Sequence, residues 1–117
     1  MTEDSELSLA QTAACAETLE WVVSTIVRGC EPERIVLFGS VAKGAWDLDS
    51  DLDLLVIAHS DLPRHRRAAP LRLLFEPYPC PMDILVYTPA EVSRWRHVTN
   101  HIVAEALRTG KVVYERV

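Results

Sequence analysis

The spacing of apolar and polar residues along the chain predicts helices and strands in a mixed order. In the first quarter of the chain, apolar residues recur at helical spacing, on a stripe made of Leu19, Val22, Val23, Ile26 and Val27. Ser8 to Gln11 has the spacing of a capping box, and Gly29 is typical of a helix end, so we expect a helix between them. Pro32 then separates this helix from the first strand.

Short apolar runs after this helix predict the strands of a small sheet. They are rich in valine, isoleucine and leucine, as strands are, and occupy residues 35–38, 51–56, 82–87 and 112–114. Thr88, Pro89 and Glu91 form a helix start, and we expect that helix to run to about Arg108 and to stop at Gly110. This order predicts an α+β domain, with a small mixed or antiparallel sheet flanked by helices.

The segment between the second and third predicted strands has a less regular pattern. Residues 61–74 are a candidate helix, which Pro70 would kink or divide. The same segment carries a basic cluster in an otherwise acidic chain, made of Arg64, His65, Arg66, Arg67 and Arg72. Such a cluster is either a wall that meets a triphosphate or an acidic partner, or a solvated helix face.

Asp51 and Asp53 are the most informative polar residues of the predicted sheet. Side chains alternate between the two faces of a strand, so both carboxylates leave one face while Leu52 and Leu54 leave the other. Neighbouring carboxylates repel each other and raise each other's pKa, and a divalent cation between them removes that repulsion. Carboxylate oxygens suit magnesium or manganese. The pair is a candidate metal site, and the plainer interpretation is a solvated turn over residues 47–51.

A Gly-Ser pair supplies the other half of a candidate site. Gly39 and Ser40 end the first apolar run, and ten residues separate them from Asp51. Backbone N–H groups and a hydroxyl in such a loop approach an anion closely, as in phosphate-binding loops. Lys43 adds a positive charge beside them. Together these parts predict a site for a nucleoside triphosphate whose phosphates are bridged by metal ions.

The residues from Gly39 to Val56 resemble the nucleotidyltransferase motif of the DNA polymerase β-like superfamily, in which Gly-Ser is followed after ten residues by Asp-x-Asp. The short chain is similar to the minimal nucleotidyltransferase branch of that superfamily. The resemblance implies a polymerase β-like fold and a third carboxylate on the following strand. Asp83 supplies that carboxylate, and its plainer interpretation is an edge-strand residue. The chain departs from relatives that often carry arginine where it has Val41 and Lys43.

The same resemblance implies metal-assisted transfer of a nucleoside monophosphate, with ATP as the substrate. Asp51 and Asp53 would hold two Mg²⁺ ions, and Asp83 would share the ion that lowers the pKa of the attacking hydroxyl. Gly39 and Ser40 would grip the β- and γ-phosphates.

The acceptor of the nucleotide is open. Relatives that act on small molecules or RNA generally carry an added helical domain, and no segment of this sequence predicts one. The resemblance suggests a helical partner of the HEPN class, a ribonuclease-like toxin, which this chain would adenylylate on a tyrosine as its antitoxin. Two alternatives stay open. One is a binding module that neutralises its partner by occlusion, and the other is a small-molecule nucleotidyltransferase that works as a homodimer.

Composition agrees with a single soluble domain over residues 1–117. The chain is 49% hydrophobic but has no apolar run long enough to cross a membrane, and its acidic N-terminus differs from a signal peptide, so we expect a cytoplasmic protein. A net charge of −5 disfavours DNA as a partner, because DNA affinity depends on neutralised phosphates. The cysteines have no metal-binding spacing, which predicts reduced thiols at Cys15, Cys30 and Cys80.

Three further residues have a functional and a plain interpretation. His97 and His101 are four residues apart on the predicted last helix, a spacing that can bind zinc, but no third ligand is evident. We therefore expect a surface or partly packed histidine pair. Trp46 either stacks on a base or a partner, or covers the edge of the core.

Overall fold

The computed structural model describes residues 2–42, 44, 51–76 and 79–117, and it places side chains from residue 16 onward except at Ser40. The elements in chain order are α1 (Thr2–Cys30), β1 (Arg34–Phe38), α2 (Gly39–Ala42), β2 (Leu52–Ile57), the 3-10 helix η1 (Arg64–Arg66), α3 (Ala68–Arg72), β3 (Met82–Tyr87), α4 (Pro89–Trp95), α5 (Ile102–Thr109) and β4 (Lys111–Glu115). No helix within the described part of the chain combines the length and the hydropathy that a bilayer crossing requires.

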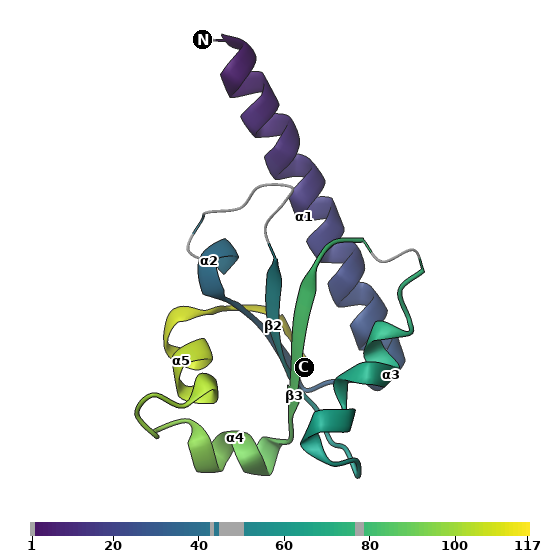
Figure 1. Cartoon of the computed structure of the whole chain (residues 1–117), viewed down its shortest axis with the longest axis vertical. Coiled ribbons are helices and arrows are strands. Elements are labelled where there is room, and N and C mark those ends of the chain that lie inside the picture. Colours follow the sequence, from purple (N-terminus) through teal and green to yellow (C-terminus); the bar gives the residue numbers. More distant parts are fainter. Residues whose placement is uncertain (1, 43, 45–50, 77–78) are drawn as a thin grey trace.

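The strands form one mixed sheet in the order β3-β2-β1-β4 (Figure 1). β1 pairs antiparallel with both β2 and β4, whereas β2 and β3 run parallel. A parallel pair needs a long crossover, which the segment containing η1 and α3 provides. The expected α+β class with a small mixed sheet is therefore confirmed, and β2, the strand that carries Asp53, lies inside the sheet rather than at its edge.

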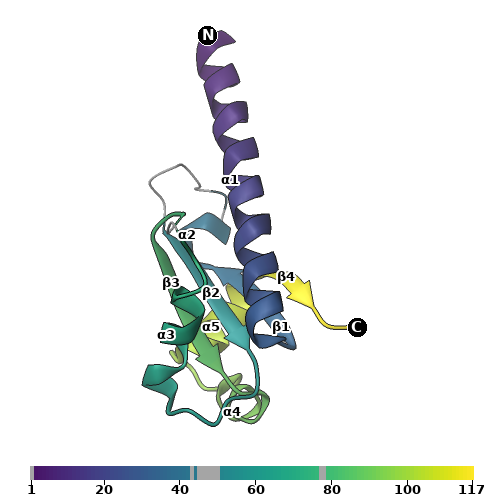
Figure 2. The same cartoon turned by 90° about the vertical axis from the view of Figure 1, so that its right-hand side faces the viewer.

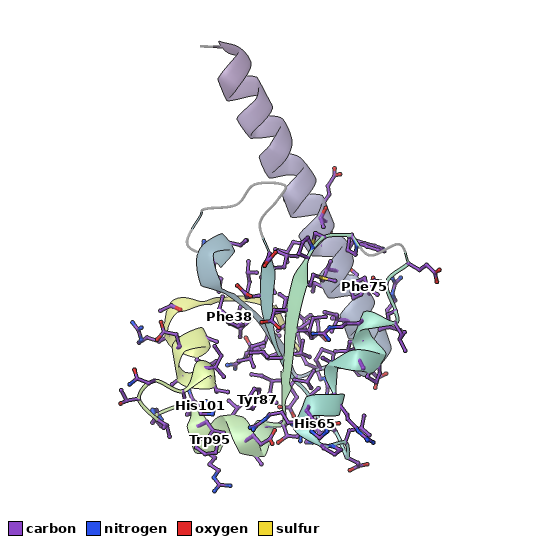
Figure 3. All side chains as sticks on the ribbon, viewed as in Figure 1. Phe38, His65, Phe75, Tyr87, Trp95 and His101 are labelled. Carbon is purple, nitrogen blue, oxygen red and sulfur yellow. The ribbon has the colours of Figure 1, made fainter. Side chains whose placement is uncertain are left out.

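One face of the sheet is covered by α4 and α5. Val92, Val103 and Ala106 of these helices pack in one cluster with alternate strand residues. Figure 3 shows Tyr87, Trp95 and His101 gathered on this side. The His101 ring stacks on Trp95 with centroids 4.6 Å apart and meets the ring of Tyr87 edge-on.

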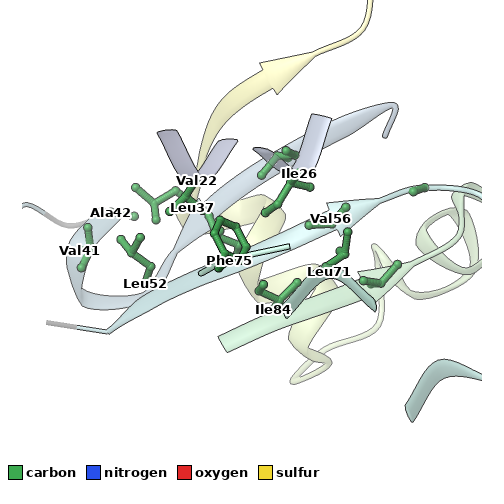
Figure 4. Packing of buried hydrophobic residues seen from close by; sticks show 14 residues of the cluster. Val22, Ile26, Leu37, Val41, Ala42, Leu52, Val56, Leu71, Phe75 and Ile84 are labelled. Carbon is green, nitrogen blue, oxygen red and sulfur yellow. The ribbon is translucent and has the colours of Figure 1, made fainter. Parts of the chain in front are cut away.

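The opposite face is covered by α1 and α3 (Figure 2). Val22 and Ile26 of α1 are completely buried, and Leu71 of α3 packs in the same cluster with Val56 and Ile84 of the sheet (Figure 4). Burying an aliphatic side chain of this size contributes roughly 1.5–3 kcal/mol. The predicted apolar stripe is thus the surface that attaches α1 to the sheet.

α1 begins earlier than the sequence predicts. The helix starts at Thr2, so the capping-box pattern at Ser8 lies inside it and marks no boundary. The sequence contains no glycine or proline before Gly29, and a helix that the sheet holds at its C-terminal half can therefore extend through the whole N-terminal segment. The helix ends at Cys30, one residue after the predicted stop.

The predicted long helix after β3 is divided into two. Its start is confirmed, because Thr88 and Glu91 form a capping box with Pro89 in the first turn. α4 nevertheless stops at Trp95, and Asn100 takes a left-handed conformation with φ of 67°. The chain restarts as α5 when the Nδ1 atom of His101 accepts a hydrogen bond from the N–H of Val103 at 3.1 Å. The predicted strand after Gly110 is present as β4.

The basic segment folds as two short helices rather than one. η1 and α3 meet at Arg67, and Pro70 is the third residue of α3. At that position the backbone nitrogen has no partner within the helix, so proline is tolerated and does not divide it. Arg67 instead marks the division: its guanidinium donates to the carboxylate of Glu91 and to the carbonyl oxygen of Val86.

Candidate active site

The pairing of three strands aligns Phe38, Asp53 and Asp83 in one row. In the antiparallel pair β1–β2, Phe38 is the partner of Asp53, and in the parallel pair β2–β3, Asp53 is the partner of Asp83. Asp51 is the residue just before β2. The structure therefore brings the carboxylates of two sequence-distant strands side by side, with the third at the strand entrance.

The two sides of β2 differ from the sequence expectation in one respect. Leu52 and Leu54 pack on the α1 side as expected. On the carboxylate side, however, Asp53 is followed by Leu55 and Ile57, which pack against α4 and α5. Hydrophobic residues therefore pack on both faces of β2, and the carboxylates of Asp53 and Asp83 lie only at the end of the sheet next to α2.

The charges of the three aspartates act on one another. Partial burial raises the pKa of Asp53 above its ordinary value, and the negative charges of Asp83 and Asp51 raise it further. Among the described residues, no lysine, arginine or histidine forms an ion pair with any of the three. The site thus carries an excess of negative charge at close range, which is unfavourable until a cation enters.

Gly39 is fitted against the carboxylate of Asp53. It has φ of 78°, in the left-handed region, and a Cβ atom built on it would lie 2.3 Å from Oδ2 of Asp53. Both the backbone conformation and the close approach require glycine here. Val41 and Ala42, which follow in α2, are buried in the core on the α1 side and hold this turn in place.

Other predicted phosphate-binding groups fall partly or wholly outside the described residues. The backbone of Ser40 is part of α2, but its side chain is not described, and neither is Lys43. Trp46 also lies outside the described residues. Their contacts with a triphosphate stay predictions.

The three carboxylates suit a divalent cation by their chemistry. They are hard oxygen donors on adjacent parts of the sheet, and their mutual repulsion is the kind that such a cation relieves. Among the described residues, no group of three acidic, histidine or cysteine side chains is already close enough together to hold a metal ion. The three carboxylates therefore suit a divalent cation by their chemistry, and they would have to move closer together when the ion binds.

The basic segment does not lie at this site. The guanidinium of Arg64 lies over the ring of Tyr87, 5.2 Å from its centroid, and Tyr87 is the last residue of β3. Tyr87 is four positions along the strand from Asp83, a distance of about 13 Å. Figure 3 shows His65 at the same distant end of the sheet. The contacts of Arg64 and Arg67 lie away from the carboxylates and do not support a wall for the triphosphate. Arg67, whose side chain is 9% exposed, instead anchors the segment to Glu91.

The fold corrects the expected placement of the histidine pair and shows where two of the cysteines lie. The pair His97 and His101 does not sit on one helix, because His97 follows α4 and His101 caps α5. Cys30 and Cys80 are half-buried at the edge of the core, and burial raises the pKa of Cys30 above its ordinary value.

Phe38 is the site neighbour that the sequence analysis did not single out. It is nearly buried and lies beside Asp53 in the strand register. The signal for it was present in the sequence, because the Gly-Ser turn ends β1 and the residue before it must then face the start of β2. An aromatic side chain next to a carboxylate excludes water from one side of it, which agrees with the raised pKa of Asp53.

Comparison with known proteins identifies the class. The profile of the family described as "Nucleotidyltransferase domain" matches residues 22–115, which is most of the chain. The chain belongs to this nucleotidyltransferase family. A search of curated proteins finds no significant match. The chain is also similar to one in a solved structure described as "Crystal structure of the toxin-antitoxin with AMP-PNP", with a TM-score of 0.57 and 21% identity over 83% of this chain and 73% of that chain. At that identity the likeness shows a shared fold.

Proposed function

We propose that this chain transfers AMP from ATP to a tyrosine hydroxyl of a separately encoded helical toxin of the HEPN class, and thereby acts as its antitoxin. The observation that carries the proposal is the strand register that aligns Asp53 with Asp83, with Gly39 against the same carboxylate. The family match supports nucleotidyl transfer. The fold neighbour, whose description names a toxin, an antitoxin and an adenine nucleotide, supports the partner and the substrate.

In the proposed reaction the acceptor oxygen attacks the α-phosphorus of ATP. The new oxygen–phosphorus bond forms as the bond to the β-phosphate breaks, pyrophosphate leaves and the hydroxyl proton is lost to water. Asp51, Asp53 and Asp83 would hold two Mg²⁺ ions, which when bound neutralise phosphate charge and lower the pKa of the acceptor hydroxyl.

The chain's own contribution is position and charge. Gly39 would let backbone approach the triphosphate without a side chain in the way, and Ser40 and Lys43 would grip its β- and γ-phosphates. Phe38 would keep water from one side of Asp53. No covalent intermediate on the protein is required.

The deciding experiment is co-expression of the chain with the product of the adjacent open reading frame, followed by intact-mass measurement of that product. We expect the partner to gain one or more whole adenylyl units, located on tyrosine by peptide fragmentation. A chain carrying Asp53→Asn, expressed to the same level, is the matched control and should leave the mass unchanged.

Occlusion is the competing function, and the long helix α1, which extends beyond the sheet, is the observation that favours it. If the Asp53→Asn chain neutralises the partner as well as the unaltered chain and neither adds mass to it, occlusion is the function. A homodimeric small-molecule transferase is indicated instead if the chain forms no complex with the partner.

The roles of the aspartates can be separated by single substitutions. If Asp83 mainly positions the metal that activates the acceptor, Asp83→Asn should lower turnover by more than it lowers triphosphate affinity. Asp51→Asn should weaken both. Calorimetric titration with a non-hydrolysable triphosphate and turnover measured in parallel decide the matter, and equal losses of affinity in the two variants contradict this division of roles.

A further inference from the structure

α1 is much longer than the sheet it packs on. Its 29 residues span about 44 Å at 1.5 Å per residue, whereas the six residues of β2 span about 20 Å. Of the α1 side chains that are described, from residue 16 on, the first that packs against the core is Leu19. The family match also begins only at residue 22. The part of α1 before Leu19, which we call the arm, is therefore an addition to the domain rather than part of its core.

The arm projects from the end of the sheet that carries the carboxylates. Figures 1 and 2 show it rising past α2 and the start of β2, while the other end of α1 reaches the opposite end of the sheet. Because α1 covers one face and Asp53 and Asp83 lie on the other, the arm does not block the site. It flanks the place from which an acceptor must approach.

An open groove lies at the root of the arm. It has a volume of about 350 Å³ and is lined by Ala16, Leu19, Glu20, Val23 and Ser24 of α1 and Val113 of β4. The α1 residues are spaced three or four apart, so they form one stripe along the helix. β4 is the edge strand of the sheet, so no further strand closes the groove on its outer side. This α1–β4 groove leaves the stripe of α1 uncovered on the side where another helix can lie against it.

The negative charge along the α1 stripe indicates which kind of protein surface binds in the groove. Glu20 lines the groove, Glu17 is exposed one turn before it on α1, and the sequence contains no lysine or arginine before Arg28. A second copy of the chain would bring like charges together, which is costly across an interface. A helix with an apolar face and basic edges would meet both the half-buried Leu19 and Val23 and the flanking carboxylates.

We propose that the arm and the α1–β4 groove form the docking surface for a helix of the partner protein, apolar on one side and basic along its edges. The inference rests on the proposed function for the existence of that partner and adds where it binds. Docking there places the partner at the carboxylate end of the sheet, so that its acceptor hydroxyl reaches Asp53 and Asp83 around the end rather than across either covered face.

The test is the affinity of the purified chain for the purified product of the adjacent reading frame. The groove variant combines Ala16→Arg and Glu20→Lys, two exposed positions where both new residues favour helix. The matched control combines Asp61→Lys and Ala69→Arg, which make the same change of charge at exposed positions outside the groove. We expect the groove variant to weaken binding at least about tenfold, since like charges then face the basic helix, and the control to leave it unchanged.

Two further measurements separate docking from catalysis. The thermal shift with magnesium and ATP should be the same in both variants, which shows that the nucleotide site is intact. Asp53→Asn should bind the partner as the unaltered chain does. If AMP is never transferred but only the groove variant loses the complex with the partner, the docking surface is supported and the proposed transfer activity is contradicted.

Three results overturn the docking surface. The first is equal binding by the groove variant and the control, whether both are retained or both are lost. The second is the absence of a complex between the unaltered chain and this partner. The third is a dimer of the chain itself that the groove variant dissociates, because the occupant is then a second copy.

Discussion

Replacing Asp51 and Asp53 together by asparagine is expected to abolish magnesium-dependent nucleotide transfer. The change removes two of the three carboxylates that the sheet brings together, and with them several kcal/mol of transition-state stabilisation, so turnover should fall about a thousandfold or more. Turnover with excess magnesium and ATP is the measurement. Asparagine keeps the size of each side chain and one of its two acceptor oxygens, so a loss of activity reports mainly the lost charge and metal ligand. A variant that retains transfer removes these residues from the site.

The same substitutions should not weaken the metal-free protein. The pKa of Asp53 is raised in the folded chain, so its contribution to stability is present below the ordinary aspartate pKa of about 3.9 and is lost as the pH rises through the folded value. At neutral pH the carboxylate therefore opposes folding, and asparagine removes that opposition. The melting temperature of the double variant at pH 7 should equal or exceed that of the unaltered chain, and the difference should close near pH 4.

Ligand binding gives the same experiment a second readout. Magnesium with ATP should raise the melting temperature of the unaltered chain by mass action, and it should not raise that of the double variant. An unchanged shift in the variant places the nucleotide elsewhere on the protein.

Gly39→Ala is expected to inactivate the protein, and Gly44→Ala is not. Both glycines have positive φ, of 78° and 92°, so alanine should cost each position about 1–2 kcal/mol of stability. Only at Gly39 does the new Cβ collide with the carboxylate of Asp53, whereas no atom of the described residues lies within 4 Å of the corresponding position at Gly44. The carboxylate must move, so turnover should fall by about a hundredfold or more, since a small misplacement of reacting groups has that effect.

Gly44→Ala is thus a control for the backbone strain. The pair is compared by melting temperature and by turnover on the same preparations. Similar losses of stability with activity lost only in Gly39→Ala support the close fit of Gly39 to Asp53. If Gly44→Ala loses as much activity as Gly39→Ala, the loss comes from strain in the turn and the fit has no special role.

The sequence was informative wherever the chemistry is local. Strand alternation and the Gly-Ser spacing located Asp53 and Gly39, and the resemblance located Asp83, whose place beside Asp53 the register now provides. The capping box at Thr88 was equally readable, because all of its hydrogen bonds lie within four residues. Such patterns involve residues that are close together in the chain, so they can be recognised in the sequence itself.

The sequence was less informative where helical periodicity does not show a break and where distant contacts decide. The division of the last helix depends on the His101 cap and its stacking on Trp95, neither of which shows in helical periodicity. The basic cluster left open a wall that meets a triphosphate or an acidic partner and a solvated helix face, yet Arg67 fits neither, because Glu91, which follows β3, holds it. Charge on its own does not reveal whether a side chain already has a partner in the fold.

The parallel pairing of β2 with β3 has a consequence for how the protein folds. β1 and β2 can pair as soon as the turn between them closes, and that step places Asp53 beside Phe38. β3 is added only after the segment containing η1 and α3 has crossed back over the sheet, and such non-local pairing is slow because the chain entropy is lost before the contacts form. The carboxylates of Asp53 and Asp83 thus meet only after the β1–β2 pair has formed, and a chain trapped before that step would hold Asp53 in place yet be catalytically silent.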